Sequence, residues 1–454
     1  MSGLSADLAL LPGGWTRNAS FDVDGRGLIA SVAEGKTGGT GIVLPGMPNL
    51  HSHSFQRAMA GLVETAGPGK DSFWTWRELM YRFVQLFGPE DIEAIASQAF
   101  AEMLCAGYTS VAEFHYLHHA PDGRPYAART ELSDRIVAAA RRTGIRLTLL
   151  PVFYAAGGFG GALPSERQRR FLNDAESFLR LVEDLRAAYD EDPMIRIGIA
   201  PHSLRAAPPD ALAEVIREAR RIDGEMPIHI HIAEQRKEVE DCVAWSGARP
   251  VDWLFDHHEV DRHWCLVHAT HMTAGETRRF ARSGAVAGLC PTTEANLGDG
   301  LFRAPAFLRQ GGVFGVGSDS NVTIDPAEEL RLLEYGQRLL LRRRNVLAEG
   351  EGSSTGAALY KATLAGGAAA LGHPIGALLP GHFADFVTLD DEAPTLTGAS
   401  GDAVLDGWIF SGGKSLVRSV SVGGREVVQD GRHIEGESIA ARYRQTLKKA
   451  LAAR

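Results

Sequence analysis

The sequence predicts an α/β protein whose central body is a (β/α)8 barrel, a TIM-like ring of parallel strands covered by helices. Two observations predict this fold. Short apolar segments alternate with longer amphipathic segments through the middle of the chain, which is the order expected of a parallel sheet with a covered outer face. Potential metal ligands follow several of the apolar segments, where barrel enzymes carry their chemistry. A doubly wound open sheet is the alternative, but no GxGxxG follows the first strand.

Eight apolar segments are expected to form the barrel strands. They cover residues 46–50, 108–113, 145–152, 195–200, 227–232, 264–268, 286–290 and 313–318. The segments between them are expected to form helices, for example residues 89–106, 131–143, 174–189, 210–221 and 273–283. The long connection between the first two strands carries the aromatic run FWTW at residues 73–76. We interpret this run as packing or as a lid.

The two ends of the chain resemble each other and differ from the middle. Residues 1–45 and 375–454 both contain short apolar pieces separated by turn residues, and the second range ends in an amphipathic segment at 439–451. We therefore expect both ends to form one small β-sandwich-like domain. Residues 46–374 would then form the barrel domain.

Composition restricts the class of protein. The chain has 454 residues and a formal net charge of −9, so a nucleic-acid partner, which needs a clustered basic surface, is not expected. The arginines at 342–344 follow an apolar helical segment and indicate a solvated helix end. No apolar run approaches the ~20 residues of a membrane helix. The cysteines Cys105, Cys242, Cys265 and Cys290 are widely spaced, which predicts free thiols and a cytoplasmic protein.

The pair His51 and His53 directly follows the first predicted strand. Residues i and i+2 of an extended segment project to the same side, so both imidazoles can reach one ion. Later strands lead to His231 and Asp319, and we predict that these four residues hold one metal ion per chain. Imidazole with carboxylate suits Zn²⁺, with Fe²⁺ or Mn²⁺ as alternatives.

Other histidines compete for these roles. We expect His229, deeper in its strand, to be a core residue, and we prefer His268 over His271 because an apolar run precedes His268. Histidines in polar loops or near the chain ends, such as His118 and His433, are expected to be exposed.

The combined pattern resembles the amidohydrolase superfamily in its mononuclear deaminase branch. The resemblance rests on HxH, on HxxE at a strand end, on a further strand-end histidine and on a late Ser-Asp. No strand-end lysine is placed to bridge two metals, so the resemblance implies one. Together with HSHSFQRAMAG at 51–61, five further stretches are similar to the formimidoylglutamate deiminase family: FWTWR at 73–77, EFHY at 113–116, APHSLR at 200–205, HIHIAEQ at 229–235 and CPTTEANLGDG at 290–300.

That resemblance implies hydrolysis of N-formimino-L-glutamate to N-formyl-L-glutamate and ammonia, a step of histidine degradation. It implies that His268, Glu234 and Asp319 handle protons around the metal. The residues implied to contact the small dicarboxylate substrate are His202, Arg205, Arg77, Tyr116 and Gln56. We also expect a homodimer.

Two other functions remain open from the sequence. Another amidohydrolase is the first: an imidazolonepropionase-like hydrolase of a cyclic amide, which would release no ammonia, or a purine or pyrimidine deaminase. A non-catalytic binding barrel is the second, and the complete set of metal ligands argues against it.

Overall fold

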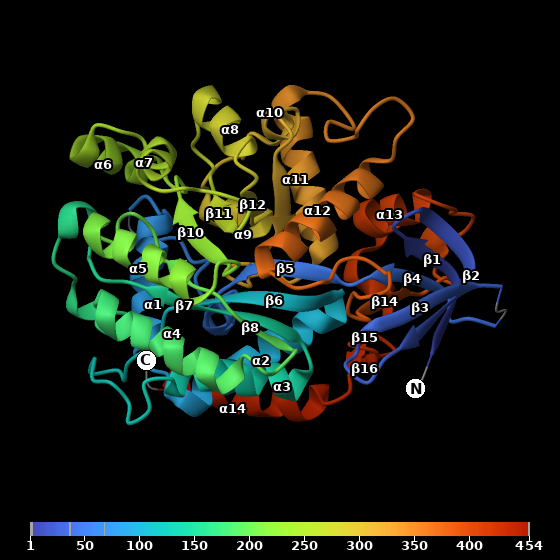
Figure 1. Ribbon diagram of the computed structural model, residues 1–454, viewed down its shortest axis with the longest axis horizontal. Coiled ribbons are helices and arrows are strands. Elements are labelled where there is room, and N and C mark those ends of the chain that lie inside the picture. The colour runs from blue at the N-terminus through green and yellow to red at the C-terminus, as the bar shows by residue number, and fades with distance from the viewer. Residues whose placement is uncertain (1–2, 36–37, 68, 453–454) are drawn as a thin grey trace.

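The central barrel is built from parallel strands in sequence order (Figure 1). The computed structural model describes residues 3–35, 38–67 and 69–452. Within these residues the barrel strands are β5 (Met47–Ser52), β6 (Tyr108–His115), β7 (Arg146–Phe153), β8 (Ile195–Ile197) with its continuation β9 (Ala200–Pro201), β10 (Ile228–Ile232), β11 (Trp264–His268), β12 (Val286–Leu289) and β13 (Val313–Val316). All eight predicted strand positions are present, and the predicted fold is confirmed.

The barrel closes where its last strand meets its first. The strands form two arcs, β5 to β8 and β10 to β13. A parallel bridge between Ser52 and Asp319 joins the arcs on one side, and bridges from Ile199 to Ile228 and from Ser203 to His231 join them on the other. These junctions place strand ends that are distant in sequence beside each other.

Helices follow the strands and cover the ring. They are α2 (Pro89–Ala106), α3 (Glu131–Thr143), α4 (Ala175–Tyr189), α5 (Pro209–Ile222), α6 (Arg236–Ser246), α7 (Pro250–His257), α8 (Ala274–Ala281), α9 (Pro291–Leu297), α10 (Ala304–Leu308), α11 (Pro326–Leu341) and α12 (Thr355–Leu371). Helix α2 illustrates the local rules. It starts with Pro89 and ends before Gly107, whose φ of 100° allows the left-handed turn into β6.

The connection after β5 adds a short 3-10 helix (Ser54–Met59) and α1 (Phe73–Val84) before α2. None of the helices in the described ranges is long and apolar enough to cross a membrane.

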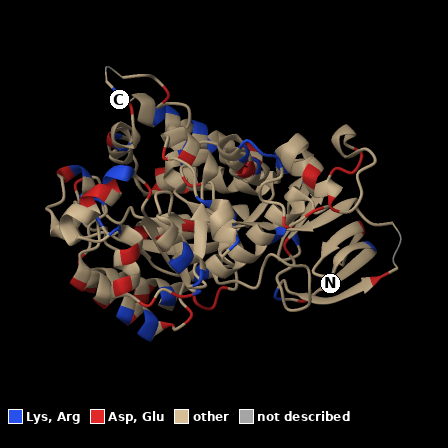
Figure 2. Ribbon diagram, turned by 90° about the horizontal axis from the view of Figure 1, so that it is seen from above, with Lys and Arg blue, Asp and Glu red and all other residues tan. Residues whose placement is uncertain are grey.

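Basic and acidic residues are intermixed over the outer helices (Figure 2). The ion pair between Arg135 and Glu131, four residues apart on α3, is one example of this pattern.

The two chain ends form a second sheet beside the barrel (Figure 1). Among the described residues this sheet has eight strands in the order β17-β16-β15-β14-β4-β1-β2-β3. The strands are β1 (Leu4–Leu11), β2 (Gly14–Val23), β3 (Ile29–Glu34), β4 (Ile42–Pro45), β14 (Phe386–Leu389), β15 (Val417–Val422), β16 (Arg425–Gln429) and β17 (Arg432–His433). The boundaries at residues 45/46 and 374/375 remain a prediction, and residues 1–2, 36–37 and 453–454 lie outside the described part.

The last helices connect this region to the barrel. Helix α13 (Ala403–Gly407) precedes β15, and α14 (Gly436–Ala452) lies along α2. Two ion pairs join α14 to α2, from Arg442 to Glu93 at 2.6 Å and from Lys449 to Asp91 at 3.3 Å. Helix α14 therefore packs on the outside of the barrel and is held there by ion pairs to α2.

A buried ion pair joins the second sheet to the barrel. Arg146 at the start of β7 places its Nη2 3.2 Å from Asp385 Oδ1, and the side chains are 0% and 2% exposed. The same oxygen accepts a hydrogen bond from Gly423 N at 2.7 Å, and the Arg146 guanidinium lies 3.4 Å from the centre of the Phe383 ring. The pair is fully desolvated, so neither partner can be removed without leaving the other unpaired in an apolar setting.

We expect Asp385→Ala to lower the free energy of unfolding by about 3–5 kcal/mol, because it leaves the Arg146 charge buried and unpaired. Urea denaturation measures the effect. The control is Glu225→Ala, which breaks the exposed pair with Arg262 and should cost less than ~1 kcal/mol. Similar losses in the two variants would show that the buried pair does not stabilise the junction.

Candidate active site

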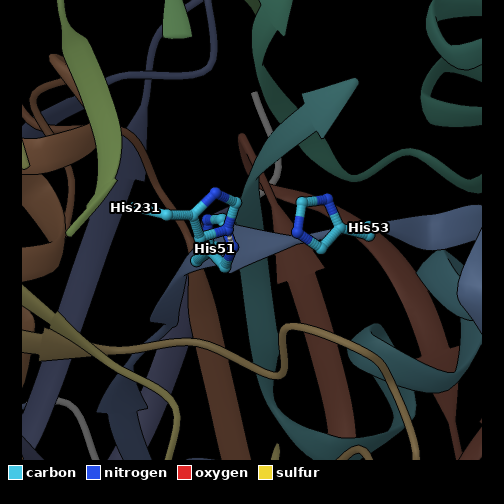
Figure 3. A group of neighbouring side chains, drawn as sticks. All are labelled: His51, His53 and His231. Atoms are coloured by element: carbon cyan, nitrogen blue, oxygen red, sulfur yellow. Dashed lines mark hydrogen bonds between the residues drawn. The ribbon is translucent and has the colours of Figure 1, made fainter. Parts of the chain in front are cut away.

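Three histidines gather at the carboxyl end of the barrel (Figure 3). His51 belongs to β5, His53 follows it directly, and His231 belongs to β10. The Nε2 atoms of His51 and His231 lie 3.0 Å apart, and one nitrogen from each of the three rings lies within 4.8 Å of the others. Strand geometry therefore brings the HxH pair and a histidine from a distant part of the chain to one point.

The hydrogen bonds of these rings fit a metal. His53 Nδ1 donates to Phe114 O at 2.9 Å, and His231 Nδ1 donates to His202 O at 3.0 Å. Because a carbonyl only accepts, these contacts leave the Nε2 lone pairs free for a ligand. Burial lowers the pKa of His51 to about 3 and lowers the pKa of His53 and His231. The three neutral imidazoles form a metal-binding site.

Asp319 completes the predicted ligand set. Its Oδ1 lies 3.5 Å from His51 Nε2 and 3.4 Å from His53 Nε2. Burial opposes its charge, but hydrogen bonding to His51 and the nearby imidazoles hold the pKa of Asp319 well below its usual range. Its carboxylate is therefore charged and available to a cation.

His268 and Glu234 lie beside this group. His268 Nε2 is 3.7 Å from Glu234 Oε1 and 3.8 Å from Asp319 Oδ2. Burial opposes the imidazolium, but Glu234, Glu294 and Asp319 raise the pKa of His268. Burial raises the pKa of Glu234, so that its carboxyl holds a proton more readily. Both groups therefore hold a proton more readily than usual, and both lie beside the metal-binding histidines, where a proton can be exchanged with a bound substrate.

The backbone at these strand ends is strained. Left-handed φ values occur at Ala233 (49°), His268 (68°), Ala269 (47°) and Asp319 (45°), although none of these residues is glycine. Such conformations are costly and are concentrated at functional sites. Here they occur where three barrel strands turn out of the ring and carry His268 and Asp319 beside the metal-binding histidines.

Glu294 is a site residue that the sequence analysis did not assign. At the start of α9, its Oε1 accepts a hydrogen bond from His268 Nδ1 at 3.3 Å and from Cys290 N at 3.0 Å. This contact directs His268 Nε2 towards Glu234 and Asp319. In the sequence, Glu294 is recognisable only as a carboxylate just after a predicted strand. Its contact with His268 depends on the packing of that strand against the neighbouring strand, which carries His268.

A cavity of about 50 Å³ adjoins the metal site and opens to the surface. Its wall includes all five predicted substrate contacts: Gln56, Arg77, Tyr116, His202 and Arg205. Gln56 Nε2 donates to the Tyr116 hydroxyl at 3.1 Å. The structure thus brings these five residues together, while their roles remain predictions.

The rest of the cavity wall is mainly aromatic. The lining residues that were not predicted as substrate contacts include Phe73, Trp76, Tyr81, Tyr154 and Phe171. Helix α1 therefore lines the cavity, and its aromatic run serves as packing and as part of the wall.

Two guanidinium groups are incompletely paired in this cavity. The Nε atoms of both Arg77 and Arg205 are buried and lack hydrogen-bond partners in the described structure. Arg205 Nη2 lies 3.8 Å from Glu234 Oε2. Two buried donors facing one cavity are suited to a ligand with two anionic groups.

The burial of the other histidines agrees with the sequence-based expectation in one case and differs from it in two. His229 is a core residue whose Nε2 donates to Ala370 O at 2.9 Å. The expectation that His118 and His433 are exposed is wrong. Both are buried and donate to backbone carbonyls, of Val152 and Thr143 respectively, contacts that local polarity in the sequence does not indicate.

Comparison with known proteins agrees with this geometry. Residues 42–427 match the sequence pattern of the Amidohydrolase family, and the chain belongs to this family. The chain is 55% identical to the formimidoylglutamate deiminase of Pseudomonas aeruginosa over 456 residues, covering 99% of this chain and 100% of the relative. The predicted family resemblance is confirmed.

Solved structures show the same fold. An amidohydrolase from Brucella melitensis superposes with a TM-score of 0.94 at 50% identity, covering 99% of this chain and 100% of that chain. An adenosine deaminase from Xanthomonas campestris with bound zinc superposes with a TM-score of 0.82 at 22% identity, covering 99% and 98%. The second likeness concerns the fold alone.

We expect His51→Ala to lose the bound metal and the activity together, because it removes one of three converging nitrogens. Metal analysis of the purified variant by mass spectrometry checks this. His271→Ala is the control, since His271 lines a separate groove, and it should keep wild-type metal content. A fully active His51→Ala protein without metal would contradict the assignment.

Proposed function

We propose that this protein is a formimidoylglutamate deiminase. It would hydrolyse N-formimino-L-glutamate to N-formyl-L-glutamate and ammonia, a step of histidine degradation. The observation that carries the proposal is the 55% identity, over 99% of the chain, to the enzyme of that name. The cavity supports it, because a metal-binding histidine cluster and two incompletely paired arginines face the same space.

We propose one Zn²⁺ ion per chain, held by His51, His53, His231 and Asp319. Imidazole and carboxylate ligands are those that zinc prefers, although Fe²⁺ and Mn²⁺ accept them too. When bound, the metal activates a water molecule for attack on a carbon centre. The adenosine deaminase from Xanthomonas campestris, which shares the fold, contains bound zinc, and this is consistent with the choice of metal.

The proton transfers are assigned to three side chains. His268 and Asp319 accept one proton of the attacking water as it adds to the formimino carbon, and the imino nitrogen gains a proton. The adduct loses its hydroxyl proton when the formyl carbonyl forms, so both water protons end on ammonia. Ammonia is a poor leaving group until its nitrogen is protonated, so collapse of the tetrahedral adduct needs an acid. Glu234, 3.7 Å from His268, donates that proton to the departing nitrogen.

The carboxylates of the substrate are assigned to the two arginines. Arg205 lies beside Glu234 and therefore close to the reacting centre, which suits the α-carboxylate on the carbon that bears the formimino nitrogen. Arg77, on α1, is assigned to the side-chain carboxylate of the substrate. Tyr116 and Gln56 are its polar neighbours in the cavity, and His202 is assigned to the reacting end of the substrate. Charge-assisted pairs of this kind fix orientation as well as affinity.

The cavity favours this substrate over the alternatives. A neutral purine or pyrimidine would offer no carboxylate to the buried, unpartnered Nε atoms of Arg77 and Arg205, which is unfavourable. A cyclic amide with one carboxylate could pair with only one of the two arginines. The homodimeric state and the cytoplasmic location remain predictions.

Zinc-loaded protein should release one ammonia per N-formimino-L-glutamate consumed, and the ammonia assay is the direct test. Adenosine, cytosine and an imidazolone propionate should release little or none. Ammonia from a nucleobase but not from N-formimino-L-glutamate would overturn the proposed function, as would consumption of the imidazolone.

His268→Asn and Glu234→Gln should each lower kcat by about 10²–10⁴-fold with metal still bound, because each removes one proton transfer. The fold-decrease in kcat of the double variant should be smaller than the product of the two single fold-decreases, since both groups serve one reaction sequence. Steady-state kinetics and metal analysis are measured on the same preparations. Loss of metal from either variant would instead identify that residue as a ligand.

A further inference from the structure

Trp74 lies against both arginines of the cavity. The Cζ of Arg77 is 4.6 Å from the centre of the Trp74 ring, and the Cζ of Arg205 is 5.8 Å from it. Both distances lie within the range of cation–π attraction, for which tryptophan is the strongest partner. One indole on α1 therefore contacts two guanidinium groups that come from segments far apart in the chain.

The contact with Trp74 matters because hydrogen bonds hold neither arginine completely. Among the described residues, neither arginine has a hydrogen-bond partner for its buried Nε, so these residues do not fully fix either guanidinium. The electron-rich face of the indole attracts both cations and restricts where they can lie. Arg77 also lies 5.5 Å from the centre of the Tyr81 ring, and Arg205 lies 3.8 Å from Glu234, but of these three contacts only the one with Trp74 is shared by both arginines. The distance between the two cationic groups then depends in part on the position of the indole ring.

Trp74 is not placed like a core residue. Its neighbour Trp76 packs against the hydrophobic core and lines the cavity. Trp74 is only half-buried and lines the adjoining groove together with Gln235 and Arg236. It thus stands in the wall between the cavity and this groove, where a partly exposed ring would contribute little to stability alone.

We propose that Trp74 is a positioning residue that sets the separation of Arg77 and Arg205, and that it thereby selects a glutamate-length dicarboxylate. This inference rests on the proposed function. A substrate with a shorter chain between its carboxylates cannot reach both guanidinium groups held at that separation. A substrate with one carboxylate does not depend on it.

The test compares three substrates: N-formimino-L-glutamate, N-formimino-L-aspartate and formiminoglycine, which lacks the second carboxylate. We expect Trp74→Met to lower kcat/KM for the glutamate substrate by roughly 10- to 100-fold, mainly through KM, because it removes the ring. The kcat/KM for formiminoglycine should fall several-fold less, because its one carboxylate engages Arg205 alone and does not depend on the separation of the two arginines. The preference for glutamate over aspartate should fall accordingly.

Trp74→Phe keeps an aromatic face that attracts cations more weakly, so it should lose only a few-fold, again more on the glutamate substrate than on formiminoglycine. If Trp74→Met does not fold, the same kinetic comparison is made with Trp74→Phe. The matched control is Trp245→Met, which removes another half-buried tryptophan, stacked on Phe159 at 5.4 Å and outside the cavity. Its kinetics should match those of the wild type on all three substrates.

Equal losses on the glutamate substrate and on formiminoglycine would overturn the inference, as would a loss confined to kcat or unchanged kinetics. Failure of the proposed function is distinguishable, because it would be seen in the wild-type protein. In that case the wild type would release no ammonia from N-formimino-L-glutamate.

Discussion

The pairing of the last barrel strand with the first is the constraint on which the site depends. Asp319 N donates to His51 O at 2.9 Å, and His53 N donates to Asp319 O at 2.9 Å. These backbone bonds fix the carboxylate of one strand end against the two imidazoles of the other before any metal binds. The geometry of the predicted ligands is thus a product of barrel closure, and any change in the register of this junction would separate Asp319 from the two histidines.

The sequence predicts the features that short spacings determine. His51 and His53 share a side because they are two residues apart in an extended segment, and Asp319 follows an apolar strand that can end only at the same rim. Helix α2 begins at Pro89 and ends before Gly107, as local propensities require. The fold and the clustering of the metal-binding histidines could therefore be inferred from the chain alone.

Contacts between distant segments could not be predicted in this way. Glu294 reaches His268 because two neighbouring strands end at matching heights, and Trp74 meets Arg205 because α1 is packed over the barrel mouth. His118 sits in a polar stretch, yet its ring is buried under a later strand. In each case the partner lies on another element, and tertiary packing determines the pair.

The second sheet has a consequence for the order of synthesis. Strand β4 lies between β1 and β14, and Leu389 pairs with Ile42. While a ribosome is still making the barrel, one edge of β4 has no partner, although its other edge can already pair with β1. Unpaired edges invite intermolecular association. The nascent chain must therefore keep this edge covered or solvated until β14 emerges, and chains interrupted before β14 would expose it permanently.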